Sequence, residues 1–151
     1  MLRKILSLGV FLTVFLCPVR AQVQYVSTAE DIALGGLVLK ELASAAGRED
    51  GPELMVRAAK RLLDQKYVAG TQEGRDEKLR IFLTQTDCIL FAETCLGLVR
   101  TAQRCGADAT FEDLAETLLL SRYRDGVVDR YESRLHYVTE WVAQGERTGL
   151  F

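Results

Sequence analysis

The stretch that decides the fold is TQTDCILFAETCLGLVRTAQRCG, residues 84–106 of a chain of 151 residues. Its apolar series from Ile89 to about Arg104 predicts one long helix, which Gly106 ends. Thr86 and Asp87 both favour the N-cap position of a helix. We therefore expect Cys88 in the first turn of this helix.

The segments before this stretch predict two helices and one strand. Ser27 and Glu30 have the spacing of a capping box, and an apolar series follows that stops near Gly47. A second helix is predicted from Gly51, with proline at its first position. After a loop at residues 67–74, apolar and polar side chains alternate over residues 79–84, which indicates a short strand.

The segments after it predict two more helices. Thr110 and Asp113 form another capping box and open a helix through Leu120. A charged turn at residues 122–126 follows, and residues 131–134 lead into a last helix. The chain is thus rich in helix with one strand candidate. Because a lone strand must pair with others, either further strands escape the pattern or they lie beyond Phe151.

The first 21 residues, MLRKILSLGVFLTVFLCPVRA, have the pattern of a secretory signal peptide. A basic start precedes an apolar run from Ile5 to Cys17, and a small-residue cleavage site ends at Ala21. The run is about 13 residues, whereas a membrane span needs roughly 20. Leu16 before Cys17 also fits a lipoprotein site poorly. We expect export to the periplasm of a Gram-negative bacterium, one mature domain over residues 22–151, and no stable membrane anchor.

The charge of the mature part argues against nucleic-acid binding. Removal of Arg3, Lys4 and Arg20 lowers the 19 Lys and Arg to 16, against 21 Asp and Glu, a net charge of −5. Nucleic acids and anionic membranes bind basic clusters instead. We expect no metal and no cofactor.

Three cysteines remain after cleavage, so at least one thiol is unpaired within the monomer. Cys88 and Cys95 would lie about 10 Å apart on one helix, too far for a disulfide. Cys95 and Cys105 are interpreted as core residues. Cys88 has two readings: a buried structural cysteine, or a nucleophile whose thiolate the helix N-terminus stabilises.

His136 is the only histidine and hence the only imidazole that could act as a general base. A half-buried groove residue or a substrate contact is the alternative role, in the first turn of the last helix. Guanidinium and phenol groups gather around it, and such groups bind carboxylates and hydroxyls. The candidate binding residues are Arg122, Tyr123, Arg124, Asp125, Tyr131, Arg134, His136 and Tyr137. A solvated charged turn is the other interpretation of this cluster.

Several motifs together resemble the N-acetylmuramoyl-L-alanine amidase-like family, exported bacterial enzymes of the NlpC-type papain-like superfamily. The resemblance runs from about Tyr67 to Trp141, and the stretch from Arg122 to Tyr137 is its most specific part. One departure is Leu90, where a threonine is expected. The motifs are YVAGT with Glu73, Asp87-Cys88 with Phe91 and Glu93, RYRDG at residues 122–126, YESRLHY at residues 131–137, and Trp141.

The resemblance implies an α+β, NlpC-type papain-like fold, here mainly its helical N-terminal half with the barrel strands largely missing. It implies hydrolysis of the amide between N-acetylmuramic acid and L-alanine in peptidoglycan fragments, with Cys88 as nucleophile. The family's base lies on a downstream strand, so we expect a truncated chain that is inactive alone. Two alternatives stay open: a complete enzyme with a Cys88–His136 dyad, and a non-enzymatic envelope binding module.

Overall fold

The computed structural model describes residues 22–150, so the predicted signal peptide at residues 1–21 and Phe151 lie outside the described residues. The helices are α1 (Ala29–Ala45), α2 (Gly51–Arg61), α3 (Cys88–Cys105), α4 (Phe111–Arg122) and α5 (Val138–Thr148). The strands are β1 (Tyr25–Val26), β2 (Lys66–Tyr67), β3 (Leu79–Arg80) and β4 (Gln85–Thr86). Short 3₁₀ turns occupy Gly106–Asp108, Arg124–Gly126 and Tyr131–Ser133.

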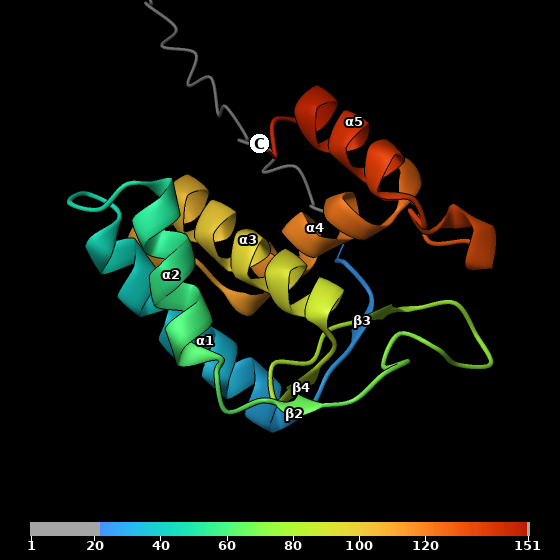
Figure 1. The fold of residues 1–151 in the computed structure, drawn as a ribbon, viewed down its shortest axis with the longest axis horizontal. Coiled ribbons are helices and arrows are strands. Elements are labelled where there is room, and N and C mark those ends of the chain that lie inside the picture. The colour runs from blue at the N-terminus through green and yellow to red at the C-terminus, as the bar shows by residue number, and fades with distance from the viewer. Residues whose placement is uncertain (1–21, 151) are drawn as a thin grey trace, which may run out of the picture.

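Helix α3 runs through the middle of the molecule and packs on α1, α2 and α4 (Figure 1). Its approach to α4 is close, because a Cβ on Gly97 would lie 2.8 Å from the side chain of Leu118. One core holds all these elements together. Its fully buried side chains include Leu39, Leu42, Leu54, Leu98, Leu114, Leu118 and, from the segment before α3, Leu79, Ile81 and Leu83. Among residues 22–150, no helix is both long and apolar enough to cross a membrane.

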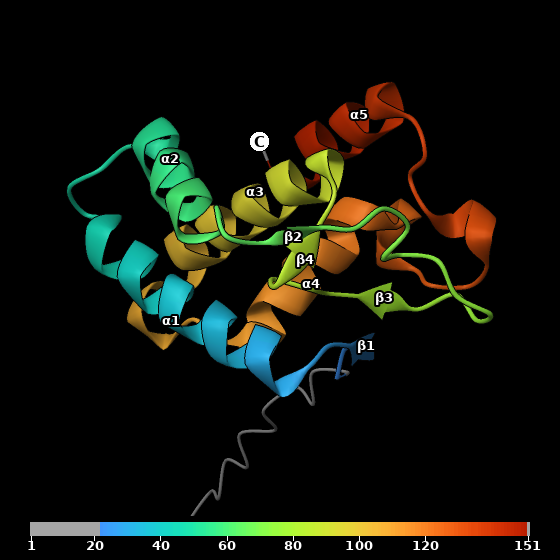
Figure 2. The same ribbon diagram turned by 60° about the horizontal axis from the view of Figure 1, so that its bottom comes forward.

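The strands are short and pair in parallel. β1 pairs with β3, and β2 pairs with β4; Figure 2 shows β1 and β3 beside α4. The strand predicted at residues 79–84 is therefore confirmed only at its start. Its partner, β1, has two residues, which are too few to show an alternation of apolar and polar side chains in the sequence. Within residues 22–150 the fold is a mostly helical α+β architecture, while the NlpC-type papain-like arrangement stays a prediction.

Most predicted helix ends are confirmed, but the starts of α1 and α5 differ from the prediction. Asp87 caps α3, and Thr110 with Asp113 forms the capping box of α4. The capping box of α1 uses Thr28 and Asp31 instead of Ser27 and Glu30. Thr28 rather than Ser27 caps α1 because the buried carboxylate of Asp31 bonds both to Thr28 and to the segment that precedes α3.

Asp31 fixes the approach of the chain to α3. One carboxylate oxygen accepts hydrogen bonds from the backbone of Leu83 at 2.7 Å and Thr84 at 2.9 Å, and from the Thr84 hydroxyl. The other accepts from the Thr28 hydroxyl at 2.6 Å. Burial alone would raise the pKa of Asp31, but these hydrogen bonds outweigh it and hold the pKa below its usual value.

Candidate active site

A groove of about 600 Å³ opens at the N-terminal end of α3. Three segments line it: the loop around Gly70 and Glu73, the first turns of α3, and the stretch from Arg134 into α5. A volume of this size lies within the usual range of small-molecule sites. The groove thus brings together parts of the chain that lie far apart in the sequence.

Cys88 lies in this groove and its side chain is exposed. It is the first residue of α3, as predicted. The Asp87 carboxylate caps the helix by accepting the backbone N–H of Ile89 at 3.0 Å and of Leu90 at 2.9 Å. The leucine that departs from the family pattern thus takes part in the cap through its backbone, so its side chain leaves the start of the helix intact.

The other two cysteines are unsuited to chemistry in the groove. All three thiols are free, which confirms that Cys88 and Cys95 do not pair. Cys95 is buried, and burial raises its pKa to about 11. Cys105 is the last residue of α3, at the helix end opposite to Cys88. Of the three cysteines within residues 22–150, Cys88 alone lines the groove.

His136 also lines the groove, and one of its two ring nitrogens is hydrogen-bonded to the backbone. Its Nε2 lies 2.8 Å from the backbone oxygen of Tyr131 and must donate to it, because a carbonyl oxygen only accepts. The ring also stacks on Tyr131 at 4.3 Å between centroids. Within residues 22–150, no hydrogen bond joins His136 to Cys88. The expected place in the first turn of the last helix is wrong, because α5 begins only after Tyr137, its N-cap.

Arg122 lines the groove and belongs to a buried ion pair. It is the last residue of α4, and its Nε donates to Glu93 Oε2 at 2.7 Å, with both side chains under a tenth exposed. A second nitrogen donates to the backbone oxygen of Arg80. Glu93 Oε1 accepts the Ser121 hydroxyl at 2.7 Å. The charged turn predicted at residues 122–126 therefore begins two residues later, at Arg124, and Arg122 ties α4 to α3 and β3.

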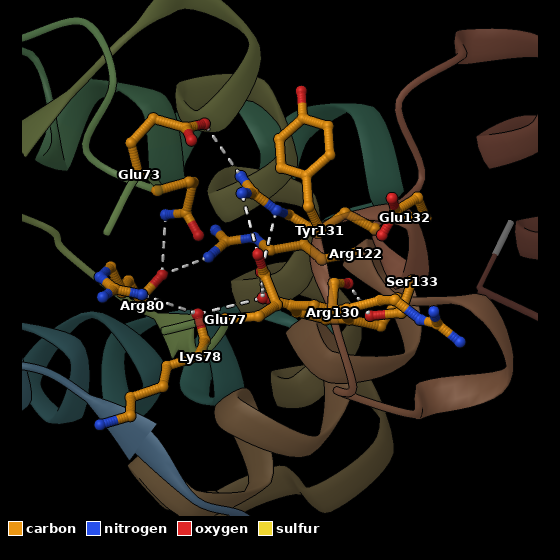
Figure 3. Close-up of polar contacts among 12 residues, drawn as sticks. Glu73, Glu77, Lys78, Arg80, Arg122, Arg130, Tyr131, Glu132 and Ser133 are labelled. Atoms are coloured by element: carbon orange, nitrogen blue, oxygen red, sulfur yellow. Dashed lines mark hydrogen bonds and ion pairs between the residues drawn. The ribbon is translucent and has the colours of Figure 1, made fainter. Parts of the chain in front are cut away.

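Arg134 also lines the groove, and it pairs with Glu73 and Glu77, two carboxylates that Figure 3 labels. Its Nε and Nη2 face the Glu77 carboxylate at 2.9 and 3.0 Å, and its Nη1 donates to Glu73 at 3.2 Å. Its guanidinium also lies over the Tyr131 ring, 4.9 Å from the centroid. The Tyr123 hydroxyl donates to the same Glu77 at 2.6 Å. Arg134 was predicted to bind a substrate carboxylate, but its guanidinium pairs with carboxylates of this chain.

Of the remaining predicted binding residues, one lines the groove and the others are buried or lie outside it. Tyr137 lines the groove and is 71 % exposed. Tyr123 is fully buried, and burial together with Glu77 raises its pKa. Arg124 pairs with Glu140, and Asp125 accepts from an arginine of α5 at 2.6 Å; neither lines the groove. Tyr131 contributes indirectly, by stacking on His136.

The predicted set of site residues lacked several groove residues, among them Glu93 and Trp141, which had appeared only in the family motifs. Glu93 is a carboxylate inside an apolar helix, and its isolation there is the signal that a buried partner exists. Trp141, one helical turn after Tyr137, lines the groove and donates from its indole Nε1 to Ser121 at 3.0 Å. No cluster of three potential metal ligands occurs among residues 22–150.

Residues 57–150 match the AmiA-like family, described as N-acetylmuramoyl-L-alanine amidase-like. The chain belongs to this family. The match covers both walls of the groove and the whole of α3, which confirms the resemblance of the motifs around Cys88 and Arg134. No curated protein matches the chain.

Solved structures agree with the amidase-like family. Two structures of an N-acetylmuramoyl-L-alanine amidase from Bacteroides uniformis share 35 % and 36 % identity with the chain, with TM-scores of 0.60 and 0.58. They cover 66 % and 62 % of this chain but 41 % and 40 % of their own. A Bacteroides fragilis protein provisionally described as a xylanase has 36 % identity and a TM-score of 0.56, with coverage of 62 % and 40 %. The chain thus spans about two fifths of the length of each of these solved structures.

Proposed function

We propose that this chain carries the nucleophile of a peptidoglycan amidase, and that Cys88 is that nucleophile. The substrate is the amide between the lactyl group of N-acetylmuramic acid and L-alanine in muropeptides. The observation that carries the proposal is the position of Cys88: an exposed thiol at the first residue of a helix, in the groove of an amidase-like domain. The N-terminal end of a helix stabilises a thiolate, and a thiolate is the reactive form of cysteine.

The reaction follows from that position. The Cys88 sulfur attacks the lactyl carbonyl carbon and forms a carbon–sulfur bond, while the carbon–nitrogen bond to L-alanine breaks. The leaving nitrogen takes up a proton and departs as the free amino terminus of the peptide. Water then hydrolyses the thioester and regenerates the thiol.

We assign the general base to a group other than His136. The Nε2 of His136 donates to the backbone oxygen of Tyr131, which leaves Nδ1 as its only basic nitrogen, and among residues 22–150 no hydrogen bond joins this ring to Cys88. In this proposal the base belongs to a barrel strand of an NlpC-type papain-like fold, outside residues 22–150, and the chain alone turns over slowly or not at all. The setting is the periplasm, after removal of the signal peptide.

Two rivals make different predictions. A Cys88–His136 dyad is favoured by the presence of both residues in one groove. It predicts turnover by the chain alone that both Cys88→Ala and His136→Ala abolish. A non-enzymatic binding module predicts muropeptide binding that is indifferent to the thiol. Release of free amino termini from N-acetylmuramoyl-L-alanyl peptides separates the dyad from the proposal.

The experiment for the proposal itself is alkylation of the thiols with iodoacetamide, followed by mass spectrometry. We expect Cys88 to react first, and an N-acetylmuramoyl-L-alanyl peptide to slow that reaction. Cys105 is the control within the same chain, because it lies at the far end of α3 and should react at the same rate with and without the peptide. Equal protection of both thiols, or of neither, would contradict the proposal.

A further inference from the structure

The groove has one aromatic side, which the proposed chemistry does not use. Tyr137 and Trp141 stand one helical turn apart at the start of α5, where the Trp141 backbone N–H donates to the Tyr137 backbone oxygen at 3.0 Å. Residues four apart on a helix share a face, and both side chains line the groove. Tyr137 is 71 % exposed, so its ring is accessible to a molecule in the groove.

Trp141 is held in a fixed orientation. Its indole Nε1 donates to the Ser121 hydroxyl at 3.0 Å, and that hydroxyl donates to Glu93 Oε1 at 2.7 Å. The same carboxylate is paired with Arg122 inside the protein. The edge of the indole is therefore anchored to a buried, charged network, and the same residue lines the groove.

Cys88 lines the same groove as Tyr137 and Trp141. In N-acetylmuramic acid the lactyl carbonyl is separated from the pyranose ring by a short ether link. A substrate with its carbonyl at Cys88 therefore has its pyranose close by, within the groove that Tyr137 and Trp141 also line. The C–H groups on one face of a pyranose form an apolar surface that packs on aromatic rings, while its hydroxyls stay at the edges.

We propose that Tyr137 and Trp141 form the saccharide subsite, on which the N-acetylmuramic acid ring packs while its lactyl carbonyl lies at Cys88. This inference rests on the proposed function, and it assigns a direction to the substrate: the sugar lies along α5, and the stem peptide runs toward the loop at Gly70 and Glu73 on the other wall. Ser121 and Glu93 are positioning residues, which act only through the indole.

Trp141 is the only tryptophan of the chain, so intrinsic fluorescence reports on this subsite alone. The experiment titrates the purified chain with N-acetylmuramic acid and, separately, with the dipeptide L-alanyl-D-isoglutamine. We expect a saturable change in tryptophan emission with the sugar and none with the dipeptide. A change with the dipeptide alone, or no change with the sugar, would overturn the subsite.

A matched pair of variants tests the second ring. Tyr137→Leu is expected to weaken sugar binding roughly two- to tenfold, the effect of one aromatic contact. Tyr67→Leu is the control, because Tyr67 is 73 % exposed but does not line the groove, and binding should change by less than about twofold. Equal effects of the two variants would contradict a role for Tyr137.

The alkylation experiment separates failure of this inference from failure of the proposed function. If an N-acetylmuramoyl-L-alanyl peptide protects Cys88 while N-acetylmuramic acid leaves Trp141 emission unchanged, the subsite is wrong and the proposed function stands. If the peptide neither protects Cys88 nor changes the emission, both are wrong.

Discussion

Glu93→Gln should be among the most damaging single changes in the chain, because it breaks the buried pair under the groove. The substitution keeps the size of the side chain and an acceptor for Ser121, but it leaves the Arg122 guanidinium without a counter-charge at 6 % exposure. Removal of one partner of a buried ion pair costs about 3–5 kcal/mol. For a small domain with a total stability of about 5–15 kcal/mol, that loss leaves little margin.

Urea unfolding followed by circular dichroism measures this loss. With an m-value of about 1–3 kcal/mol/M, the midpoint should fall by more than about 1 M. Asp129→Asn is the matched control, since it makes the same chemical change in a pair whose side chains are 65 % and 76 % exposed, where at most about 1 kcal/mol is expected. A Glu93→Gln midpoint within the range of that control would refute the argument.

Two further predictions concern Asp31 and the glycines of the helices. The hydrogen bonds that lower the pKa of Asp31 stabilise the fold fully above the unfolded-state pKa of about 3.9. This stabilisation is lost as the pH falls through the lower pKa of the folded state. Asp31→Asn should therefore lower the urea midpoint at pH 7, and the midpoint of the variant should decline less below about pH 4. Gly97→Ala should destabilise by about 1–3 kcal/mol, because its Cβ would lie 2.8 Å from Leu118. Gly36→Ala, with no atom within 4 Å of the new Cβ, should stabilise by up to about 1 kcal/mol in thermal unfolding. A pH profile unchanged by Asp31→Asn, or equal effects of the two alanines, would contradict these assignments.

The sequence predicts the helices well because their ends depend on local chemistry. Asp87 and the pair Thr110 and Asp113 satisfy N–H groups of the helices that follow them, and Gly106 ends α3. Such signals lie within four residues of the place they determine, and they put Cys88 at the start of α3 correctly. The error at α1 has the same origin: Ser27 and Thr28 are both good caps, and only the distant partners of Asp31 favour the second.

The roles of the arginines could not be predicted in the same way. Arg122 and Arg134 belong to a polar string that looks like a solvated turn, yet their partners lie some 30 to 60 residues away, at Glu93, Glu73 and Glu77. A guanidinium that binds a substrate carboxylate and one that binds an internal carboxylate have the same local sequence. Only the fold distinguishes the two cases, and in this chain both arginines bind internal carboxylates and so hold the segments that line the groove.

Acylation of Cys88 by an activated substrate tests the central claim most directly. A p-nitrophenyl ester of the lactyl carboxylate of N-acetylmuramic acid has a leaving group that needs no proton, so the thioester should form even where the general base is absent. We predict one added N-acetylmuramoyl group per chain by intact mass, absent from Cys88→Ser and unchanged in Cys105→Ser. An unmodified chain, or labelling that persists in Cys88→Ser, would contradict the assignment of Cys88 as the nucleophile.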